Sequence, residues 1–330
     1  MNAISQVLMP PLLSRALENR PVVLADVGAA GGIHERWSML DQHLRVLGFE
    51  PDRRAFDGLP KQSNRVWVNA ALTDHEGEAK LLVTNHQTNT SLLPANRPII
   101  DRIYQDPSDF NVIKEVVVPC TTLDRVSLIE NLEITALKAD TQGTELSILQ
   151  GAEKCLQKSL MVVELEVEFT QLYSNQPLFA EVDLFMREHG FVLFDIGNLL
   201  YHKWRNSSHV GGRKGQLLAA DALYFRAPES LVEISKNNEE CIQLLAQYWA
   251  VCTVYGYTDL AFEVARESAG KGWISSDMMK SIDAWVDSNS RQPILPKLRG
   301  RGRAASWMRK FADQVDAKHH SYWINPLGNI

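Results

Sequence analysis

Apolar and polar positions alternate in blocks from about residue 20 to residue 226. Val22–Val27 is a short, mostly apolar run closed by glycines, which is typical of a strand buried on both faces. Leu44–Phe49 and residues 134–139 and 160–165 predict further core strands of the same kind. Helix-like segments separate these runs, so the pattern predicts a doubly wound, mostly parallel α/β sheet.

The middle of this region has a weaker pattern. Residues 65–72 predict another core strand, and residues 78–84, which follow the polar turn 73–77, predict a hairpin partner or an edge strand. Residues 85–114 show no clear period and are rich in Asn, Pro, Asp and Ser. We expect a long loop over the active edge there, since long loops in compact domains tend to be functional. Residues 115–121 are β-branched and predict a strand.

The pattern of the following residues predicts two helices. Apolar residues recur at helical spacing over residues 144–156, and Pro177 suits the first turn of the next helix, which Gly190 ends. Residues 191–196 and 222–225 predict two last strands. Parallel strands followed by such a terminal pair fit a seven-stranded sheet.

The hydrophobic pattern of the chain changes after Arg226, beyond which helix-forming residues with amphipathic spacing dominate. We divide it into an N-terminal helix (1–19), a main domain (20–228) and a helical C-terminal region (229–330). Within the last, residues 292–303 hold two prolines, two glycines and four basic residues and predict a linker, and residues 304–318 predict a final helix before an aromatic tail. We expect this region to serve in dimerisation or partner contact rather than in chemistry.

Composition narrows the class of protein. Of 330 residues, 45% are hydrophobic and 22% charged, which is ordinary for a globular protein, and the net charge of -6 argues against a nucleic-acid partner. The four cysteines are isolated, so neither a metal cluster nor a disulfide framework is indicated. The first residues lack a signal-peptide pattern, and no run approaches the roughly 20 apolar residues of a membrane span. We therefore expect a cytoplasmic protein.

The strongest local signal is the glycine turn that follows the first strand, with Asp26, Gly28, Ala29 and Gly32. A dinucleotide site needs a second glycine where Ala30 stands, so that the backbone can approach the pyrophosphate. A carboxylate at Asp26 would repel a pyrophosphate but would favour a ligand ammonium group. S-adenosylmethionine has an ammonium group and no phosphate, so the spacing favours this cofactor over NAD.

Further acidic residues complete the predicted cofactor site. Glu50 closes the next strand, about 20 positions on, where a carboxylate can accept hydrogen bonds from ribose hydroxyls. Asp74, in the polar turn, is a further candidate for cofactor binding. The alternative for Asp26 and Glu50 is structural: one would be a turn residue and the other a helix cap.

A combination of motifs resembles the FkbM family of S-adenosylmethionine-dependent methyltransferases over about residues 20–226. The motif most specific to it is Leu137-Lys138-Ala139-Asp140-Thr141-Gln142-Gly143-Thr144-Glu145, continuing to Leu149-Gln150-Gly151-Ala152. The others are Asp26-Val27-Gly28-Ala29 with Gly32, Phe49-Glu50-Pro51, Thr122-Leu123-Asp124, Glu166-Val167-Glu168-Phe169, and Leu172-Tyr173 before Gln176-Pro177-Leu178-Phe179. The chain departs from the family at Ala30, where members often have Asn, and in the variant turn 31–37.

The resemblance implies a Rossmann-like class I methyltransferase fold, with a seven-stranded, mostly parallel sheet and helices on both faces; the C-terminal helices would be an appendage. It also implies O-methylation of a hydroxyl on a saccharide, polyketide or other small metabolite. Two alternatives stay open: a methyltransferase acting on nitrogen or on a protein, and an inert cofactor-binding module used in assembly. A homodimer through the C-terminal helices is a further expectation.

Asp140 is the main catalytic candidate, because it closes a core strand at the carboxyl edge, where ligands bind in open α/β sheets. Its alternative role is to cap the following helix. It could accept the acceptor's proton, orient a histidine such as His86, or hold a divalent cation together with Glu164 or Glu166. We favour the metal-free options and expect no metal.

Glu164, Glu166 and Glu168 alternate along one extended segment, so they share a face. A buried strand cannot hold three unpaired carboxylates, and we therefore expect the chain to leave the core there. The three either line the cleft beside Asp140 or pair with basic groups such as Lys138.

Overall fold

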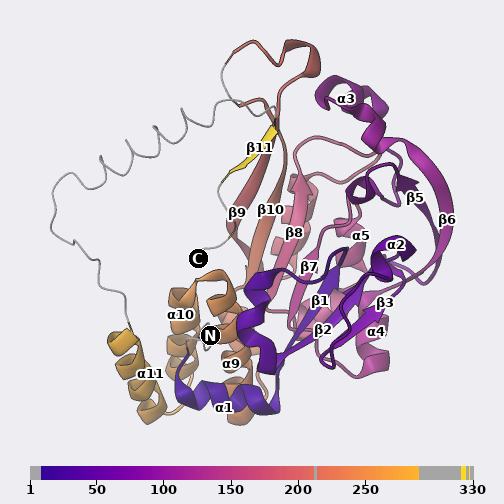
Figure 1. The fold of residues 1–330 in the computed structure, drawn as a ribbon. Helices are drawn as coiled ribbons and strands as arrows, with labels where there is room; N and C mark the ends of the chain where they lie inside the picture. The colour runs from indigo at the N-terminus through magenta and orange to yellow at the C-terminus, as the bar shows by residue number, and fades with distance from the viewer. Residues whose placement is uncertain (1–8, 212–213, 290–320, 325–326, 328–330) are drawn as a thin grey trace, which may run out of the picture.

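The computed structural model describes residues 9–211, 214–289, 321–324 and 327. Its centre is an eight-stranded sheet in the order β11-β9-β10-β8-β7-β1-β2-β3 (Figure 1). In that order the strands are β11 (Ser321–Ile324), β9 (Phe191–His202), β10 (Gln216–Arg226), β8 (Val162–Glu168), β7 (Ala136–Ala139), β1 (Val22–Val27), β2 (Leu44–Phe49) and β3 (Arg65–Val68).

The sheet confirms the expected class I methyltransferase fold. Strands β3, β2, β1, β7 and β8 are parallel, and β10 is inserted antiparallel between β8 and β9. Strand β1 lies in the middle of the sheet, with β2 and β3 on one side and β7 and β8 on the other. The strand order therefore reverses beside β1, and ligands bind at such a point in open α/β sheets. The eighth strand, β11, comes from the predicted aromatic tail and pairs antiparallel with β9.

Each face of the sheet has its own hydrophobic core, and β1 contributes side chains to both. Val22 and Leu24 pack into one core, whereas Val23, Ala25 and Val27 pack into the other, as the two-residue period of a strand requires. The second core is covered by α4 (Leu123–Glu130), α5 (Glu145–Gln150), α6 (Glu153–Lys158) and α7 (Phe179–Glu188). The strand is mostly apolar in sequence, apart from Asp26, because both of its faces are buried.

The first core is covered mainly by C-terminal helices. The helices are α8 (Pro228–Glu233), α9 (Asn238–Tyr255), α10 (Thr258–Gly270) and α11 (Ser276–Asn289), joined by α1 (Pro11–Asn19) and the 3-10 helix η1 (Glu35–His43). Figure 1 shows α1, α9 and α10 gathered on one side of the sheet. Thirteen of the eighteen residues of α9 are buried, so this helix is apolar nearly all round.

The hydrophobic pattern of the sequence changes near residue 228, but the residues on both sides of this boundary pack into one hydrophobic core. Helix α9 takes the place of a sheet-covering helix, since only η1 separates β1 from β2 and only the four-residue α2 (Arg53–Phe56) precedes β3. A dimer contact through the C-terminal helices stays a prediction, and α9 is too buried to form it. The predicted linker 292–303 and helix 304–318 lie outside the described residues.

The expectations for residues 65–114 need correction. The strand predicted over residues 65–72 is divided between β3 and β4 (Ala71–Leu72), and β4 belongs to a separate three-stranded sheet, β4-β6-β5, with β5 (Gly77–Thr84) and β6 (Val112–Thr121). The long loop predicted over residues 85–114 holds η2 (Gln87–Asn89), α3 (Arg97–Ile103) and η3 (Pro107–Phe110). These elements are too short to repeat a hydrophobic period, which is why the pattern does not show them.

Two further predictions are wrong for reasons of packing. The helix predicted over residues 144–156 breaks at Gly151, where an added Cβ would lie 2.1 Å from the carbonyl oxygen of Thr73. The chain does not leave the core after Leu165, since β8 continues to Glu168 and pairs with β10 throughout. Two of its carboxylates have partners: Glu164 accepts from the Tyr255 hydroxyl at 2.6 Å and lies 3.4 Å from the Arg36 guanidinium, and Glu166 accepts from the Gln142 amide.

Candidate active site

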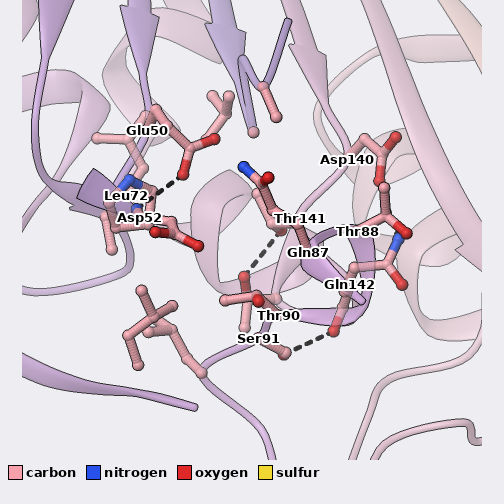
Figure 2. A pocket seen from close by; sticks show the side chains of 18 of the residues that line it. Glu50, Asp52, Leu72, Gln87, Thr88, Thr90, Ser91, Asp140, Thr141 and Gln142 are labelled. Atoms are coloured by element: carbon pink, nitrogen blue, oxygen red, sulfur yellow. Dashed lines mark hydrogen bonds between the residues drawn. The ribbon is translucent and has the colours of Figure 1, made fainter. Parts of the chain in front are cut away.

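A pocket of about 230 Å³ opens at the carboxyl ends of β1, β2 and β7. Figure 2 shows Asp140 and Gln142 on one side of it and Glu50 on the other. Its lining residues come from the strand ends, from β4 and β5, and from η2 and the segment after it: Val27, Gly28, Ala30, Glu50, Pro51, Asp52, Ala71, Leu72, Leu81, Gln87, Thr88, Thr90, Ser91, Leu92, Lys138, Asp140, Thr141, Gln142 and Thr144.

The glycine turn forms the floor of the pocket. Gly28, Gly31 and Gly32 all have positive φ angles, which L side chains rarely adopt. A Cβ at Gly28 would lie 2.0 Å from the carbonyl oxygen of Asp140, so only glycine lets the ends of β1 and β7 approach this closely. Ala29 is 1% exposed, its N–H donates to Phe49, and neither it nor Gly32 lines the pocket.

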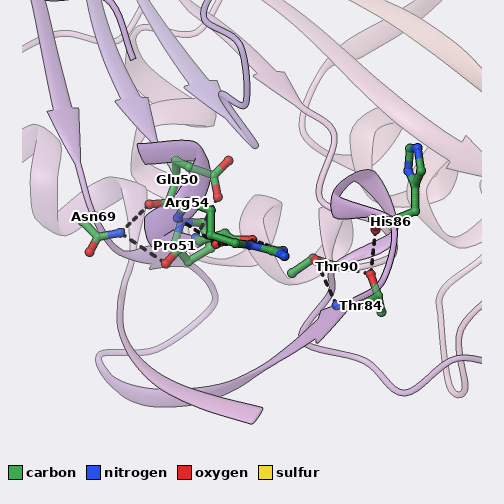
Figure 3. Close-up of polar contacts among 8 residues, drawn as sticks. Glu50, Pro51, Arg54, Asn69, Thr84, His86 and Thr90 are labelled. Carbon is green, nitrogen blue, oxygen red and sulfur yellow. Dashed lines mark hydrogen bonds and ion pairs between the residues drawn. The ribbon is translucent and has the colours of Figure 1, made fainter. Parts of the chain in front are cut away.

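Glu50 is positioned at one end of the pocket by backbone contacts. Its Oε1 accepts a hydrogen bond from the Asp52 N–H at 2.7 Å, and the Asn69 amide donates to its carbonyl at 2.7 Å (Figure 3). The side chain is buried, and burial raises the pKa of Glu50 to about 7 in spite of the bond from Asp52. Hydroxyl donors in the pocket would therefore meet a carboxylate that lacks hydration.

Lys138 stands between the two other predicted carboxylates. Its Nζ lies 4.0 Å from Oδ1 of Asp26 and 3.7 Å from Oδ2 of Asp140. Burial raises the pKa of Asp26 to about 6, although Lys138 acts against this. Burial would also raise the pKa of Asp140, but Lys138 and hydrogen bonds hold it below its usual range. Asp26 has a side chain that is 5% exposed and lies behind the lining residues, whereas the Asp140 side chain is 43% exposed.

The turn after β7 is fixed by Glu145. Its carboxylate accepts from the Thr141 N–H at 2.7 Å, the Thr141 hydroxyl at 2.9 Å and the Gly143 N–H at 3.1 Å. The turn needs these bonds because Gln142 has a φ of 59° and Gly143 a φ of 110°, both outside the usual range for L residues. Glu145 therefore has a structural role in holding the lining residues 141–144.

A roof over the pocket comes from η2 and the residues after it. The Ser91 hydroxyl donates to the Gln142 carbonyl at 2.8 Å and so ties the roof to the turn after β7. His86, which Figure 3 shows beside Thr84 and Thr90, precedes the roof but does not line the pocket, and its Nδ1 lies 2.8 Å from the Thr88 hydroxyl. In the part of the chain that the structure describes, no hydrogen bond joins His86 to Asp140, although Thr88 lines the same pocket as Asp140.

The structure brings together some predicted residues and leaves others outside. Gly28, Glu50 and Asp140 line the pocket, while Asp26 lies directly behind it. Asp74 does not line it; its half-exposed carboxylate lies 2.7 Å from His75 and accepts from Ser147. Its role in cofactor binding stays a prediction.

Sequence reasoning did not assign Lys138 or Gln142 to the site. A lysine within the apolar strand Ala136–Ala139 was the available signal, because a buried ammonium needs nearby carboxylates. Gln142 belongs to the motif of residues 137–145, but its contacts come from segments far apart in the chain, which the sequence does not show.

The described residues hold neither a candidate metal centre nor a candidate membrane span. In the segments that the structure describes, no three His, Cys, Asp or Glu side chains form a group that could hold a metal ion. No described helix combines the length and the apolar character needed to cross a bilayer.

Comparison with known proteins gives a family match. The methyltransferase FkbM domain matches residues 26–193 of the sequence. No curated protein matches it.

Similar solved structures are remote. One is the methyltransferase FkbM from Methylobacillus flagellatus KT, with 17% identity and a TM-score of 0.34 over 62% of this chain and 43% of that one. This chain thus spans less than half the length of that protein. Another is a precorrin-6y C5,15-methyltransferase from Geobacter metallireducens GS-15, with 11% identity and a TM-score of 0.32 over 65% of this chain and 87% of that one. A third, the magnesium protoporphyrin IX methyltransferase from Synechocystis PCC 6803 with bound SAM, has 7% identity and a TM-score of 0.29 over 66% of this chain and 76% of that one.

Proposed function

Because the chain belongs to the FkbM family of methyltransferases, we propose that it transfers a methyl group from S-adenosylmethionine to a hydroxyl oxygen. The acceptor is a saccharide, a polyketide or another small metabolite. The observation that carries the proposal is that Glu50 and Asp140, at the ends of β2 and β7, line one pocket across the glycine turn that follows β1.

The residues of the pocket fit this cofactor. Glu50 would accept hydrogen bonds from the ribose hydroxyls, and Leu72 and Leu81 supply apolar surface for the adenine. Gly28 lets the ends of β1 and β7 meet at the floor, because a Cβ there would lie 2.0 Å from the carbonyl oxygen of Asp140. Asp26 is the expected partner of the ammonium group, and it acts from behind the lining residues.

The chemistry required of the protein is small. When bound, the cofactor supplies a methyl group on a positively charged sulfur. The chain's part is to hold the acceptor oxygen in line and to take up its proton. Asp140 suits the second task, because its low pKa keeps the carboxylate ionised and its side chain is partly open to the pocket. The geometry supports direct proton uptake over a role through His86.

The same pocket weighs against an inert module. Asp140 and the roof residues Thr88 and Ser91 share one open space, whereas a binding module without catalysis would be expected to have this space filled. A methyltransferase acting on nitrogen or on a protein is the remaining alternative. Release of S-adenosylhomocysteine with hydroxylated saccharides, but not with amines or proteins, would decide between them.

Calorimetry with S-adenosylmethionine, S-adenosylhomocysteine and NAD tests the cofactor. We expect heat with the first two ligands only, and heat with NAD alone would refute the proposal. Asp26→Ala should weaken binding by about 3–5 kcal/mol if the site is dry, since it leaves a buried charge unpaired. Asp101→Ala is the matched control, because it removes an ion-paired carboxylate that is half-exposed and outside the pocket.

Asp140→Asn tests the base. We expect turnover with an accepted substrate to fall about 10²–10⁴-fold while cofactor affinity changes little. Unchanged turnover would remove Asp140 from the mechanism. Loss of wild-type activity with EDTA, restored by magnesium, would overturn the metal-free mechanism.

A further inference from the structure

The side-chain amide of Gln142 bridges two carboxyl groups at the pocket. Its Nε2 lies 2.7 Å from Oε2 of Glu166 on β8 and 3.1 Å from Oδ1 of Asp140. The two hydrogens of an amide allow one bond to each acid at the same time. Asp140 and Glu166 are thereby held side by side, although they come from different strands.

The amide itself is held in this orientation by groups from two other segments. The Tyr173 hydroxyl lies 3.1 Å from Gln142 Oε1, which places the nitrogen toward the carboxyl groups. The Ser91 hydroxyl binds the Gln142 carbonyl, and the residue keeps a left-handed backbone. The hydroxyls of Tyr173 and Ser91 thus help to maintain a strained backbone at Gln142, and such strain is typical of a functional position.

We propose that Gln142 is a positioning residue that holds Asp140 and Glu166 as one proton-sharing pair, in which Asp140 is the base and Glu166 carries the proton. The inference rests on the proposed function only for the role of the base. The pair itself is a property of the free protein.

The electrostatic surroundings shift the pKa values of Asp140 and Glu166 in opposite directions. Burial raises the pKa of Glu166 well above its usual range, and the charge of Asp140 adds to this, whereas Lys138 favours ionised Asp140. Two neighbouring carboxyl groups cannot both ionise easily, so one keeps a proton. The other titratable groups facing the pair are Asp26 from β1, Glu145 from α5, Glu168 from β8, Asp221 from β10 and Tyr104 after α3.

In the transfer step the acceptor's O–H bond breaks and its O–CH₃ bond forms, while the S–CH₃ bond of the cofactor breaks. The proton passes to the Asp140 carboxylate, and S-adenosylhomocysteine is the other product. The pair then holds two protons, and the exposed side of Asp140 allows one to return to solvent. Gln142 donates hydrogen bonds to both carboxyl groups, whether ionised or protonated, and takes no proton itself.

Carbon-13 titration of the side-chain carboxyls in the free protein tests the pair, with Asp140→Asn and Glu166→Gln for assignment. We expect two steps, one below pH 4 and one well above it, that both depend on both residues. Gln142→Leu should raise the Asp140 midpoint by about one pH unit, because a hydrogen bond to the charged form is lost. Tyr173→Phe should shift it in the same direction by less.

Tyr224→Phe is the matched control, since it removes another buried hydroxyl, one near Asp183 on α7. It should leave both midpoints unchanged. If Gln142→Leu fails to fold, Tyr173→Phe decides by the same shift. Independent titration of Asp140 and Glu166 near pH 4 in the wild type, or unchanged midpoints in the folded variants, would overturn the pair. Failure of the wild type to bind S-adenosylmethionine would instead overturn the proposed function, so the two failures are distinguishable.

Discussion

Gly28→Ala offers the sharpest test of how the floor of the pocket is built. Gly28 has a φ of 76°, so alanine there adopts a left-handed conformation that costs about 1–2 kcal/mol. Its Cβ would also lie 2.0 Å from the carbonyl oxygen of Asp140, an overlap that neither backbone segment can relieve without moving. Overpacking of this kind costs about 1–3 kcal/mol more.

Gly31→Ala separates the cost of the left-handed backbone from the cost of the steric overlap. Gly31 has a φ of 86°, but an added Cβ meets no atom within 4 Å. We therefore expect this variant to lose only the conformational part, about 1–2 kcal/mol of unfolding free energy, against roughly 2–5 kcal/mol for Gly28→Ala. Urea unfolding of both variants measures the difference, provided that the slopes match.

The overlap has a second consequence for function. Displacing the Asp140 carbonyl also moves the end of β7, which carries the proposed base and Lys138. Gly28→Ala should therefore weaken S-adenosylhomocysteine binding more than tenfold, on the order of 1.4 kcal/mol or more. Equal destabilisation of the two variants, or unchanged affinity in folded Gly28→Ala, would refute this account of the strand contact.

Two further predictions concern the site and the first core, which α9 covers. Affinity for S-adenosylhomocysteine should rise from pH 6 to pH 8, because ribose hydroxyls bind the ionised carboxylate of Glu50, whose pKa is about 7 in the free protein. Below that pH the affinity should fall by up to about tenfold per pH unit. Calorimetry measures this dependence, and Glu50→Gln should flatten it. Truncation after Arg226 should abolish cooperative unfolding and expose apolar surface to a hydrophobic dye, because α9 covers one face of the sheet; a folded, ligand-binding fragment would show instead that the C-terminal region is a separate appendage.

The sequence by itself determined the features that depend on neighbouring residues. The apolar run Val22–Val27, the glycines after it and the acid at Glu50 predict a strand, a turn and a second strand end, since these depend on backbone conformation and on a short period. The alternation of such units predicts the parallel sheet, and Asp140 then falls at its carboxyl edge without any knowledge of strand order.

Only the tertiary structure decided which of these residues meet. Glu164 and Glu166 remain in a buried strand because Tyr255, Arg36 and Gln142 reach them from distant parts of the chain.

The role of α9 was also decided by the tertiary structure. The sequence shows only that the hydrophobic pattern changes before this helix, whereas the structure shows that the helix covers one face of the sheet. Partners of this kind depend on strand order and register, which bring together residues with no regular spacing along the chain.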